Sequence, residues 1–585
     1  MCGIIGYVGS KNRSLSVVIE GLERLEYRGY DSAGIAFLNN GKLDITKEKG
    51  KIINLKEKLD FNIKSNLGIG HTRWATHGEP NYINSHPHKI GKITIVHNGI
   101  IENYMELKKK LEEVGYKFKS STDTEVACAL LDNIYKETNS IEQTLSNFRN
   151  QAKGAYALGI IVDDDYDHLY ALKKDSPLIV AVGTEENYIA SDVPAILKFT
   201  NKYILLNDYE FAKISKDKVV VYDKNCEIVK KDIKVFEGNS NEGDKGEYEH
   251  YMLKEIYEQP EVIKATLKEF EKTNIPDIRK YNKIYIVACG SAFHAGLVGK
   301  TMIEEFAGIE VNVEVASEFR YKKLFLDSKS LVIIISQSGE TADSLAALNI
   351  AKEYGADTLG IINVVESSIA RAADMVVYTK AGTEIAVATT KAYLSQVAVL
   401  SLIAESIAKV DINNDVVKLP TLMQSILNNN YKDIANKVFE NDKIFFIGRD
   451  VDYALSMEGS LKLKEISYIN SQAYPAGELK HGTISLIDEG TPVFAIVTEK
   501  SISEKTISNI KEVKARGAYV ILITNESTFI EGDYYDELVV LPNIHKLLSP
   551  LLTVLPLQLI SYEVAKLRKC DIDKPKNLAK SVTVE

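Results

Sequence analysis

The sequence predicts an α+β layered domain over residues 1–236, followed by two doubly wound α/β units over residues 248–420 and 421–570. Short apolar runs separated by turn residues fill the first block. Beyond it, strands of the buried type alternate with helices, as parallel sheets require. The second half also repeats itself, because the strand ending at Asn363 recurs with its end at Asn525, 162 residues later. Such a repeat indicates two copies of one supersecondary unit.

Composition excludes several classes of protein. A chain of 585 residues with 45% hydrophobic and 26% charged residues is typical of a soluble protein with several cores. Its net charge of −10 argues against a broad grip on nucleic acid or an anionic membrane. The five cysteines lack the paired spacing of a zinc or redox site, and no stretch reads as a leader or a membrane span. We expect a cytoplasmic protein without a metal.

The first block mixes strands and helices. Apolar runs predict strands near residues 67–72, 93–98, 156–162 and 177–183, and helical periodicity appears near 15–25, 104–114 and 124–135. Residues 237–247, EGNSNEGDKGE, are polar and glycine-rich without periodicity. This composition is typical of a linker and places the domain boundary there.

Cys2 is the most unusual residue of the first block. Removal of Met1 would leave its own α-amino group as a base for the thiol. The alternative is a small buried hydrophobic residue. Polar and glycine-rich clusters at strand ends favour the nucleophile, because loops there present groups to a substrate. These clusters are YRGYDSAG (27–34), HTRWATHG (71–78), HNGIIEN (97–103) and STDTE (121–125).

With these motifs, the first block resembles the class II glutamine amidotransferase domain of the N-terminal-nucleophile hydrolase fold, with layers in the order αββα. From Cys2 to the terminal LAKSVTVE, the chain resembles the glutamine:fructose-6-phosphate aminotransferase family. It lacks the long insertion of the eukaryotic members, which makes it similar to the prokaryotic type. The resemblance implies that Cys2 attacks the glutamine side-chain amide, while the Asn98 side chain and the Gly99 backbone N–H form the oxyanion hole.

The resemblance also assigns the groups that hold glutamine. Arg73 matches the position that binds the α-carboxylate, and a guanidinium suits that task. Asp123 matches the position that binds the α-ammonium. Thr76 and His77, three and four residues after Arg73, are expected to take part in substrate binding. Trp74, the sole tryptophan, corresponds to a gate on a channel that carries ammonia between two active sites.

The segment SQSGET at residues 336–341 directly follows a predicted strand and opens a helix. Hydroxyls, backbone N–H groups and a helix N-terminus make an anion cradle, although a serine-rich helix cap is the alternative. Resemblance to sugar isomerase domains implies a sugar phosphate, contacted by Ser336, Gln337, Ser338, Thr341, Val387 and Thr389.

One departure from the family lies after the first strand of this unit. Relatives often carry Cys-Gly-Thr-Ser, whereas this chain has Cys289, Gly290, Ser291 and Ala292. Ser291 keeps a hydroxyl for the phosphate, but Ala292 has none. We therefore expect a weaker or rearranged grip at this point.

Acid and base groups are predicted in the third block. Glu458, Lys462 and Glu465 are spaced i, i+4, i+7 and share one helical face, which in isolation is typical of a solvated row of ion pairs. The resemblance implies that Glu465 moves the proton between C1 and C2, that Lys462 supports it and that His481 assists ring opening. It further implies that Lys580, in the tail 571–585, forms a Schiff base with the ketose.

Further expectations concern assembly and the tail. In relatives the histidine of GELKHG reaches a neighbouring subunit's site, so a homodimer is expected. Lys576 stands where relatives commonly carry arginine, which leaves its role in ordering the tail open.

The resemblance implies conversion of fructose 6-phosphate and L-glutamine to glucosamine 6-phosphate and L-glutamate, the first step of hexosamine synthesis, with no cofactor. One alternative is a relative that deaminates or deglycates another amino-sugar phosphate, against which the Cys2 block argues. The other is a sugar-phosphate sensor that binds DNA. That alternative needs a DNA-binding helix pair and a basic face, and the sequence indicates neither.

The second copy of the repeat departs from the first at the cradle. Its counterpart of SQSGET is TEKSIS at residues 498–503, where Glu499 replaces Gln337 and Ser501 replaces Gly339. A carboxylate repels phosphate, and a side chain at 501 hinders close backbone approach. The second copy is therefore predicted to have lost the phosphate site.

Overall fold

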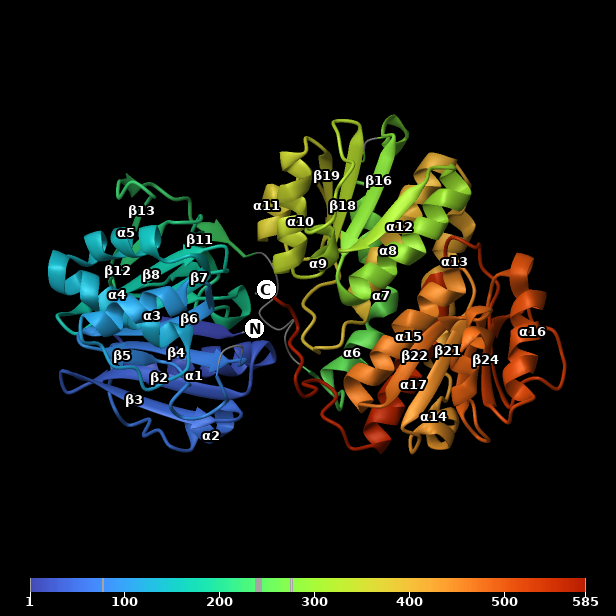
Figure 1. Cartoon of the computed structure of the whole chain (residues 1–585), viewed down its shortest axis with the longest axis horizontal. Coiled ribbons are helices and arrows are strands. Elements are labelled where there is room, and N and C mark those ends of the chain that lie inside the picture. The colour runs from blue at the N-terminus through green and yellow to red at the C-terminus, as the bar shows by residue number, and fades with distance from the viewer. Residues whose placement is uncertain (1, 76–77, 237–244, 274, 276, 584–585) are drawn as a thin grey trace. The chain divides into compact units, whose positions relative to one another are not determined.

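The computed structural model describes residues 2–75, 78–236, 245–273, 275 and 277–583. The chain forms two compact units, Met1–Gly243 with Ser581–Glu585, and Asp244–Lys580 (Figure 1). Most of the predicted linker, residues 237–244, lies outside the described residues.

The described part of the first unit contains two antiparallel sheets. The larger one runs in the order β15 (Lys234–Val235), β11 (Lys202–Leu205), β9 (Ile179–Val182), β10 (Glu186–Ala190), β1 (Gly3–Gly9), β4 (Leu67–Arg73), β2 (Ser32–Asn39) and β3 (Lys42–Lys49). The other runs in the order β14 (Ile228–Val229), β13 (Val219–Tyr222), β12 (Phe211–Ile214), β8 (Asp165–Lys174), β7 (Gly154–Val162), β6 (Ile93–Ile101) and β5 (His88–Ile90).

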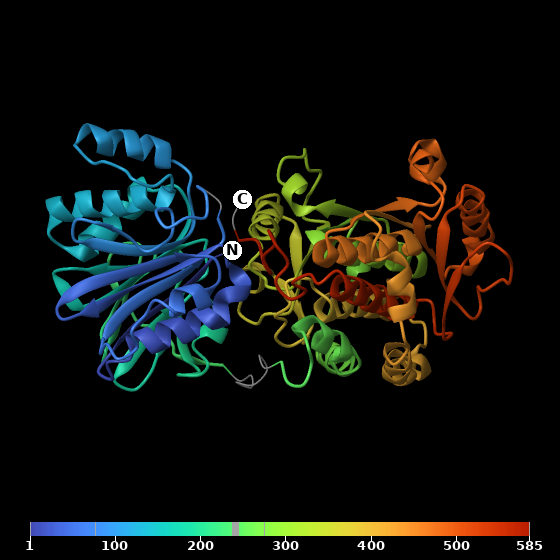
Figure 2. The same cartoon turned by 90° about the horizontal axis from the view of Figure 1, so that it is seen from below.

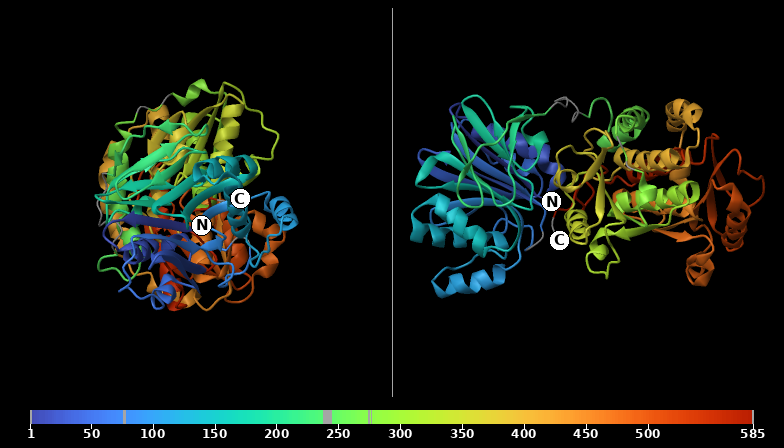
Figure 3. Two further views of the ribbon diagram at one scale, coloured as in Figure 1. Left: turned by 90° about the vertical axis from the view of Figure 1, so that its left-hand side faces the viewer. Right: turned by 90° about the horizontal axis from the view of Figure 1, so that it is seen from above.

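These sheets stack face to face, and helices cover both outer faces (Figures 2 and 3). Strand β1 explains this layering, because its side chains are apolar on both faces. Ile4 packs with Val96 of the opposite sheet, while Ile5 packs with Leu22 of the helix at residues 14–25. Successive side chains of a strand point to opposite faces, so an all-apolar strand is buried on both. The predicted αββα layering is confirmed. Its helices are α1 (Ser14–Leu25), α2 (Ile52–Lys56), α3 (Tyr104–Glu113), α4 (Asp123–Thr138) and α5 (Ile141–Gln151).

The second unit carries two parallel sheets of the same topology. The first runs in the order β17 (Val311–Val315), β16 (Lys283–Ala288), β18 (Ser330–Ser336), β19 (Asp357–Ile362) and β20 (Met375–Tyr378). The second runs in the order β22 (Asn470–Pro475), β21 (Lys443–Gly448), β23 (Pro492–Val497), β24 (Tyr519–Asn525) and β25 (Glu537–Leu541). The predicted repeat is confirmed, since corresponding strands take corresponding places.

One apolar core runs through both copies, because Ile286 and Ile333 of the first sheet belong to the same cluster as Phe446 and Ile496 of the second. Helices of the two copies pack on each other, α8 on α15 among them. Side chains of the two copies therefore come into direct contact. The helices are α6 (Tyr251–Tyr257), α7 (Gln259–Phe270), α8 (Gly290–Met302), α9 (Ala316–Phe319), α10 (Ala342–Glu353), α11 (Ser368–Ala372), α12 (Lys391–Ala408), α13 (Asn413–Leu427), α14 (Lys432–Val438), α15 (Val451–Ser467), α16 (Ser503–Lys514) and α17 (Ser549–Leu567).

The most apolar long stretch of the sequence forms α12, whose residues from Lys391 to Ala404 are buried in the second unit. Within the described ranges, no helix combines the length and apolar character needed to cross a membrane.

Candidate functional site

Cys2 lies directly before β1 and against the end of β4. The Trp74 backbone N–H donates to Cys2 Sγ at 3.3 Å, and Asn98 Nδ2 donates to the Cys2 carbonyl oxygen at 3.0 Å. Burial raises the pKa of the Cys2 thiol. The thiol is therefore protonated at neutral pH and needs a base before it can attack.

The orientation of the Asn98 amide is fixed by His71, which the sequence did not single out. His71 Nε2 lies 3.1 Å from Asn98 Oδ1 and 2.9 Å from the His97 carbonyl oxygen. Both partners accept, so Nε2 carries the hydrogen and donates. Burial lowers the pKa of His71 to about 3, which keeps the ring neutral. The amide nitrogen of Asn98 is thus left facing Cys2.

Gly99 follows Asn98 in β6 with φ +125°, a conformation that side-chain-bearing residues rarely adopt. A Cβ atom there would lie 2.0 Å from the Ala155 carbonyl oxygen. Glycine is therefore required at the position where an oxyanion donor is predicted.

A cation and an anion line the same pocket as Cys2. Arg73, 4% exposed, ends β4 and donates to the Gly78 carbonyl oxygen at 3.0 Å. Asp123 opens α4 and accepts from the Ile101 N–H at 2.8 Å. Thr76 and His77 lie outside the described residues. The pocket is lined by Cys2, Arg73, Trp74, His86, His97, Gly99, Thr122, Asp123 and Thr124.

The segment at residues 336–341 gathers donors at the carboxyl end of β18. Ser336 Oγ lies 3.0 Å from Thr341 Oγ1 and accepts from the Gly339 N–H at 3.0 Å, while Ser338 Oγ accepts from the Glu340 N–H at 3.1 Å. Gly339 has φ +64°, and a Cβ atom there would clash with Ser367 Oγ at 1.9 Å. Half-exposed Gln337 and Ser338 form the outer part of the loop. Hydroxyls and backbone N–H groups at the end of a parallel strand are groups that anion sites commonly use.

In the second copy, a carboxylate of the protein occupies the corresponding place. Asp452, 1% exposed, accepts from the Thr498 N–H at 2.9 Å, from Thr498 Oγ1 at 2.5 Å and from the Glu499 N–H at 3.3 Å. Asp452 lies 160 residues beyond Ala292, the same offset that separates β16 from β21. The first copy has the methyl group of Ala292 at the sequence position where the second has this carboxylate.

A buried charge cluster connects the two copies. Ser291 Oγ donates to Glu458 Oε1 at 2.9 Å, and His294 Nδ1 lies 2.8 Å from Glu458 Oε2. Lys462, only 1% exposed, lies 2.6 Å from Glu465 and 3.6 Å from Glu458. The face of α15 is therefore buried rather than a solvated row of ion pairs. Burial works to lower the pKa of Lys462, but the carboxylates of Glu465 and Glu458 outweigh it and raise the pKa.

The tail and the segment before α12 meet in the same unit. Lys580 Nζ is paired with Glu384, whose carboxylate also accepts from Thr389 Oγ1. The Val387 N–H donates to the Asp573 carbonyl oxygen at 3.0 Å, which ties the segment to the chain leading into the tail.

Two other predicted residues lie at less buried positions. Lys576 lies over the Tyr468 ring, 4.4 Å from its centroid. His481 is exposed in a short 3₁₀ turn, Glu478–His481.

This fold and these sites define an enzyme class that joins a glutamine amidotransferase domain to a pair of SIS domains. The glutamine amidotransferase family model matches residues 83–198, and the SIS domain model matches residues 277–406 and 437–568.

Relatives match over the full length. The glutamine–fructose-6-phosphate aminotransferase (isomerizing) of Caldanaerobacter subterraneus is 49% identical, and that of Staphylococcus aureus is 44% identical, each with 100% of both chains covered. A solved C-terminal domain of glucosamine-fructose-6-phosphate aminotransferase from Francisella tularensis is 36% identical, covers 57% of this chain and 100% of that one, and gives a TM-score of 0.53. The chain belongs to the glutamine–fructose-6-phosphate aminotransferase family.

Proposed function

We propose that this chain converts fructose 6-phosphate and L-glutamine into glucosamine 6-phosphate and L-glutamate. The observation that carries the proposal is one pocket lined by Cys2, Arg73 and Asp123, in a chain whose relatives match it from end to end. The reaction has two halves, which are glutamine hydrolysis in the first unit and amination with isomerisation in the second.

In the glutamine half, Cys2 Sγ attacks the side-chain amide after its α-amine takes the thiol proton. Asn98 Nδ2 and the Gly99 N–H stabilise the negative oxygen of the tetrahedral intermediate, and one such donor is typically worth about 10²- to 10³-fold in rate. The His71 contact supports this role, because it presents the Asn98 amide as a donor.

Glutamine is held by its two charged ends. Arg73 binds the α-carboxylate and Asp123 the α-ammonium, with Thr76 and His77 assisting. Both described charges are almost fully buried, which strengthens their interaction with a bound zwitterion. Trp74 gates the path of the released ammonia. Ammonia is mostly protonated in neutral water, so an apolar path keeps it nucleophilic.

In the sugar half, the cradle of the first copy holds the phosphate through Ser336, Gln337, Ser338 and Thr341. Ser291 assists this grip, while Val387 and Thr389 contact the sugar. Lys580 forms a Schiff base at C2, Glu465 carries the proton between C1 and C2, Lys462 supports Glu465, and His481 assists ring opening. The burial of Lys462 and the pairing of Lys580 support these assignments.

The proposal includes an organisation of the chain. Residues 1–236 form the amidotransferase domain, 248–420 and 421–570 the two sugar isomerase domains, and 571–585 a catalytic tail. The protein acts as a homodimer in the cytoplasm, and His481 serves the site of the other subunit. The exposure of His481 supports this arrangement.

The test is an assay of the purified protein with fructose 6-phosphate and glutamine labelled with ¹⁵N in its amide. We expect glucosamine 6-phosphate that carries the ¹⁵N label and unlabelled glutamate, in equal amounts. An enzyme that instead releases ammonia from glucosamine 6-phosphate without any need for glutamine would be the deaminating alternative.

The asymmetry of the two copies predicts unequal effects of hydroxyl removal. Ser338→Ala or Thr341→Ala should raise the KM for fructose 6-phosphate roughly 10- to 150-fold, because a donor to a charged ligand contributes about 1.5 to 3 kcal/mol. In the second copy, Thr498→Ala or Ser503→Ala should change it less than about twofold, since Asp452 already fills that place. Steady-state kinetics measure both values.

Calorimetry gives an independent check on this asymmetry. We expect one sugar phosphate bound per chain. Two per chain, or equal losses from both pairs of variants, would contradict the asymmetry.

Subunit sharing predicts complementation between inactive variants. Mixing His481→Ala and Lys580→Ala chains under conditions that exchange subunits should restore about a quarter of the wild-type activity, because half of the dimers are mixed and each has one intact site. Activity that stays absent, while mass measurements show mixed dimers, would place His481 in its own chain's site.

A further inference from the structure

Lys580 and Glu384 form an ion pair removed from water. Their side chains are 4% and 0% exposed. Glu384 also accepts from the Thr389 hydroxyl, the Thr390 N–H at 2.9 Å and the Ala392 N–H at 3.1 Å. With four donors around it, this carboxylate is ionised. Lys580 is thus held as an ammonium, which lacks the lone pair that imine formation needs.

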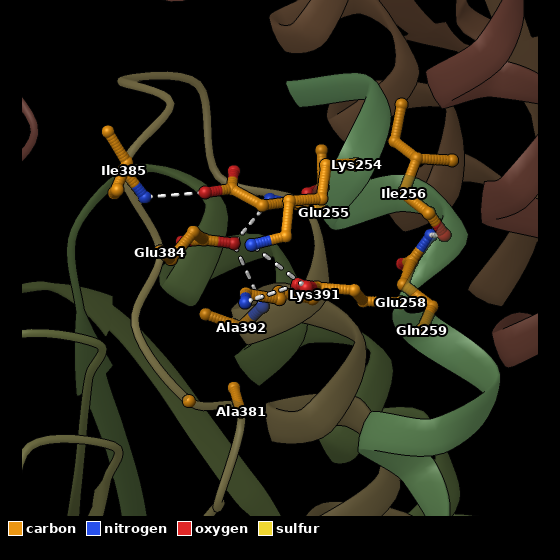
Figure 4. A network of polar contacts seen from close by, with 12 residues as sticks. Lys254, Glu255, Ile256, Glu258, Gln259, Ala381, Glu384, Ile385, Lys391 and Ala392 are labelled. Carbon is orange, nitrogen blue, oxygen red and sulfur yellow. Dashed lines mark hydrogen bonds and ion pairs between the residues drawn. The ribbon is translucent and has the colours of Figure 1, made fainter. Parts of the chain in front are cut away.

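A second carboxyl group, Glu255 of α6, reaches the same segment (Figure 4). Glu255 Oε1 accepts from the Ile385 N–H at 2.5 Å and the Ala386 N–H at 3.2 Å, directly after Glu384 in sequence. Among the described residues, its other oxygen has no hydrogen-bond partner, although the residue is only 2% exposed. An ionised carboxylate with a bare buried oxygen is costly, whereas a protonated one is tolerated.

The charges around Glu255 come from three other elements and from its own helix, α6. The segment before α12 contributes Glu384, the tail contributes Lys580, and α12 contributes Lys391. Lys391 Nζ lies 2.7 Å from the Glu258 carboxylate. Helix α6 itself carries Lys254, whose ammonium lies 3.4 Å from the carboxylate of Glu258 at the end of the helix. Burial, and then the negative charge of Glu384, raise the pKa of Glu255 to about 8. The pKa of Glu384 is lowered, since Lys580 and the other donors outweigh its burial.

We propose that Glu255 is a positioning residue for the Lys580 amine: its neutral carboxyl anchors the segment that carries Glu384 and keeps a single negative charge facing Lys580. This inference rests on the proposed Schiff-base role of Lys580. Glu255 acts through Glu384 and the segment after it, without touching the sugar.

The proton balance explains the need for a single charge. The Lys580 ammonium gives one proton to the Glu384 carboxylate, and the freed lone pair forms the C–N bond to C2 of the ketose. The two hydrogens left on nitrogen depart with the carbonyl oxygen as water, which gives the imine. The proton on Glu384 then remains available to the imine nitrogen. An ionised Glu255 would add a second negative charge and favour the ammonium, so imine formation would slow.

The test compares Glu255→Gln with Glu255→Ala in the full chain. We would measure the rate at which borohydride traps fructose 6-phosphate on Lys580 between pH 6.5 and about 9.5, together with synthase kinetics. In the wild type, the trapping rate should fall above pH about 8, where Glu255 ionises. Glu255→Gln keeps an acceptor for both amides and cannot ionise. It should stay within about twofold of wild type at pH 7 and lose the alkaline decline.

Glu255→Ala removes the acceptor itself and should raise the KM for fructose 6-phosphate about 10-fold, because Val387 lies in the released segment. Glu261→Gln on α7, where the carboxylate is 76% exposed, is the matched control and should keep both the KM and the alkaline decline. Glutamine hydrolysis should be unchanged in all three variants.

Two results would overturn the inference, and only the second of them would also contradict the proposed Schiff base. An adduct on Lys580 whose pH profile is the same in Glu255→Gln as in the wild type would remove Glu255 from this role and leave the proposed function standing. An adduct on a different lysine of the wild-type chain would contradict the Schiff-base assignment, and the inference with it.

Discussion

Cys2→Ala is expected to abolish glutamine hydrolysis, with a loss of at least about 10⁴-fold in kcat, because no other group replaces the nucleophile. Binding of fructose 6-phosphate should stay within about twofold of the wild-type value, since the cradle lies in the second unit. Glutaminase assays and calorimetry with fructose 6-phosphate measure the two quantities. Any slow isomerisation of the ketose phosphate without glutamine should also survive.

Cys226→Ala is a matched control, because this thiol lies in the same unit but does not line the Cys2 pocket. It should hydrolyse glutamine at the wild-type rate. Glutaminase activity that persists in Cys2→Ala would remove Cys2 from its role as nucleophile.

The same chemistry requires that Met1 be removed. A retained Met1 would convert the α-amine of Cys2 into an amide, which cannot take the thiol proton. Burial raises the pKa of this thiol, so a base is needed at neutral pH. Mass spectrometry of active protein should therefore find Cys2 as the first residue.

Local pattern was sufficient to predict a layered α+β block and two α/β units, whereas the αββα order of the first block was implied by the resemblance. The repeat offset that joins Asn363 to Asn525 predicted two sheets of equal topology, because strand and helix periodicity is a local property. The spacing of Glu458, Lys462 and Glu465 correctly placed them on one face of a helix. It left the environment of that face open, since its burial depends on α8 from the other copy.

The residues that sequence reasoning missed act through tertiary contacts. Glu384 lies three residues before Val387, which the sequence analysis did name, yet its pairing with Lys580 spans 196 positions. Glu255 lies in a helix with no motif, and His71 was noted only as part of a cluster. Asp452 could have been found by aligning the two copies, because it occupies the position that corresponds to Ala292. A single sequence shows spacing along the chain, but not which distant carboxylates meet.

Substitution of Lys580 is the second change for which we expect a large loss of activity. Lys580→Arg should abolish glucosamine 6-phosphate synthesis by at least about 10⁴-fold, because a guanidinium stays protonated and forms no imine. Arginine retains the positive charge beside Glu384, so the free energy of unfolding should change little. Glutamine hydrolysis should persist at least in part, since Cys2 and its pocket are untouched. Reduction with borohydride in the presence of fructose 6-phosphate should label Lys580 of the wild type and give no adduct in the variant.

Lys580→Ala separates the chemical role from the structural one. It leaves Glu384 as a buried carboxylate without its cation, which typically costs about 3 to 5 kcal/mol. The double variant Lys580→Ala/Glu384→Gln should regain most of that stability in denaturant unfolding, because it removes the unpaired charge as well, yet it should remain inactive in synthesis. If stability returned together with activity, Lys580 would be only a counter-ion for Glu384. An adduct found on Lys462 or Lys391 of the wild type would instead move the Schiff base to that residue.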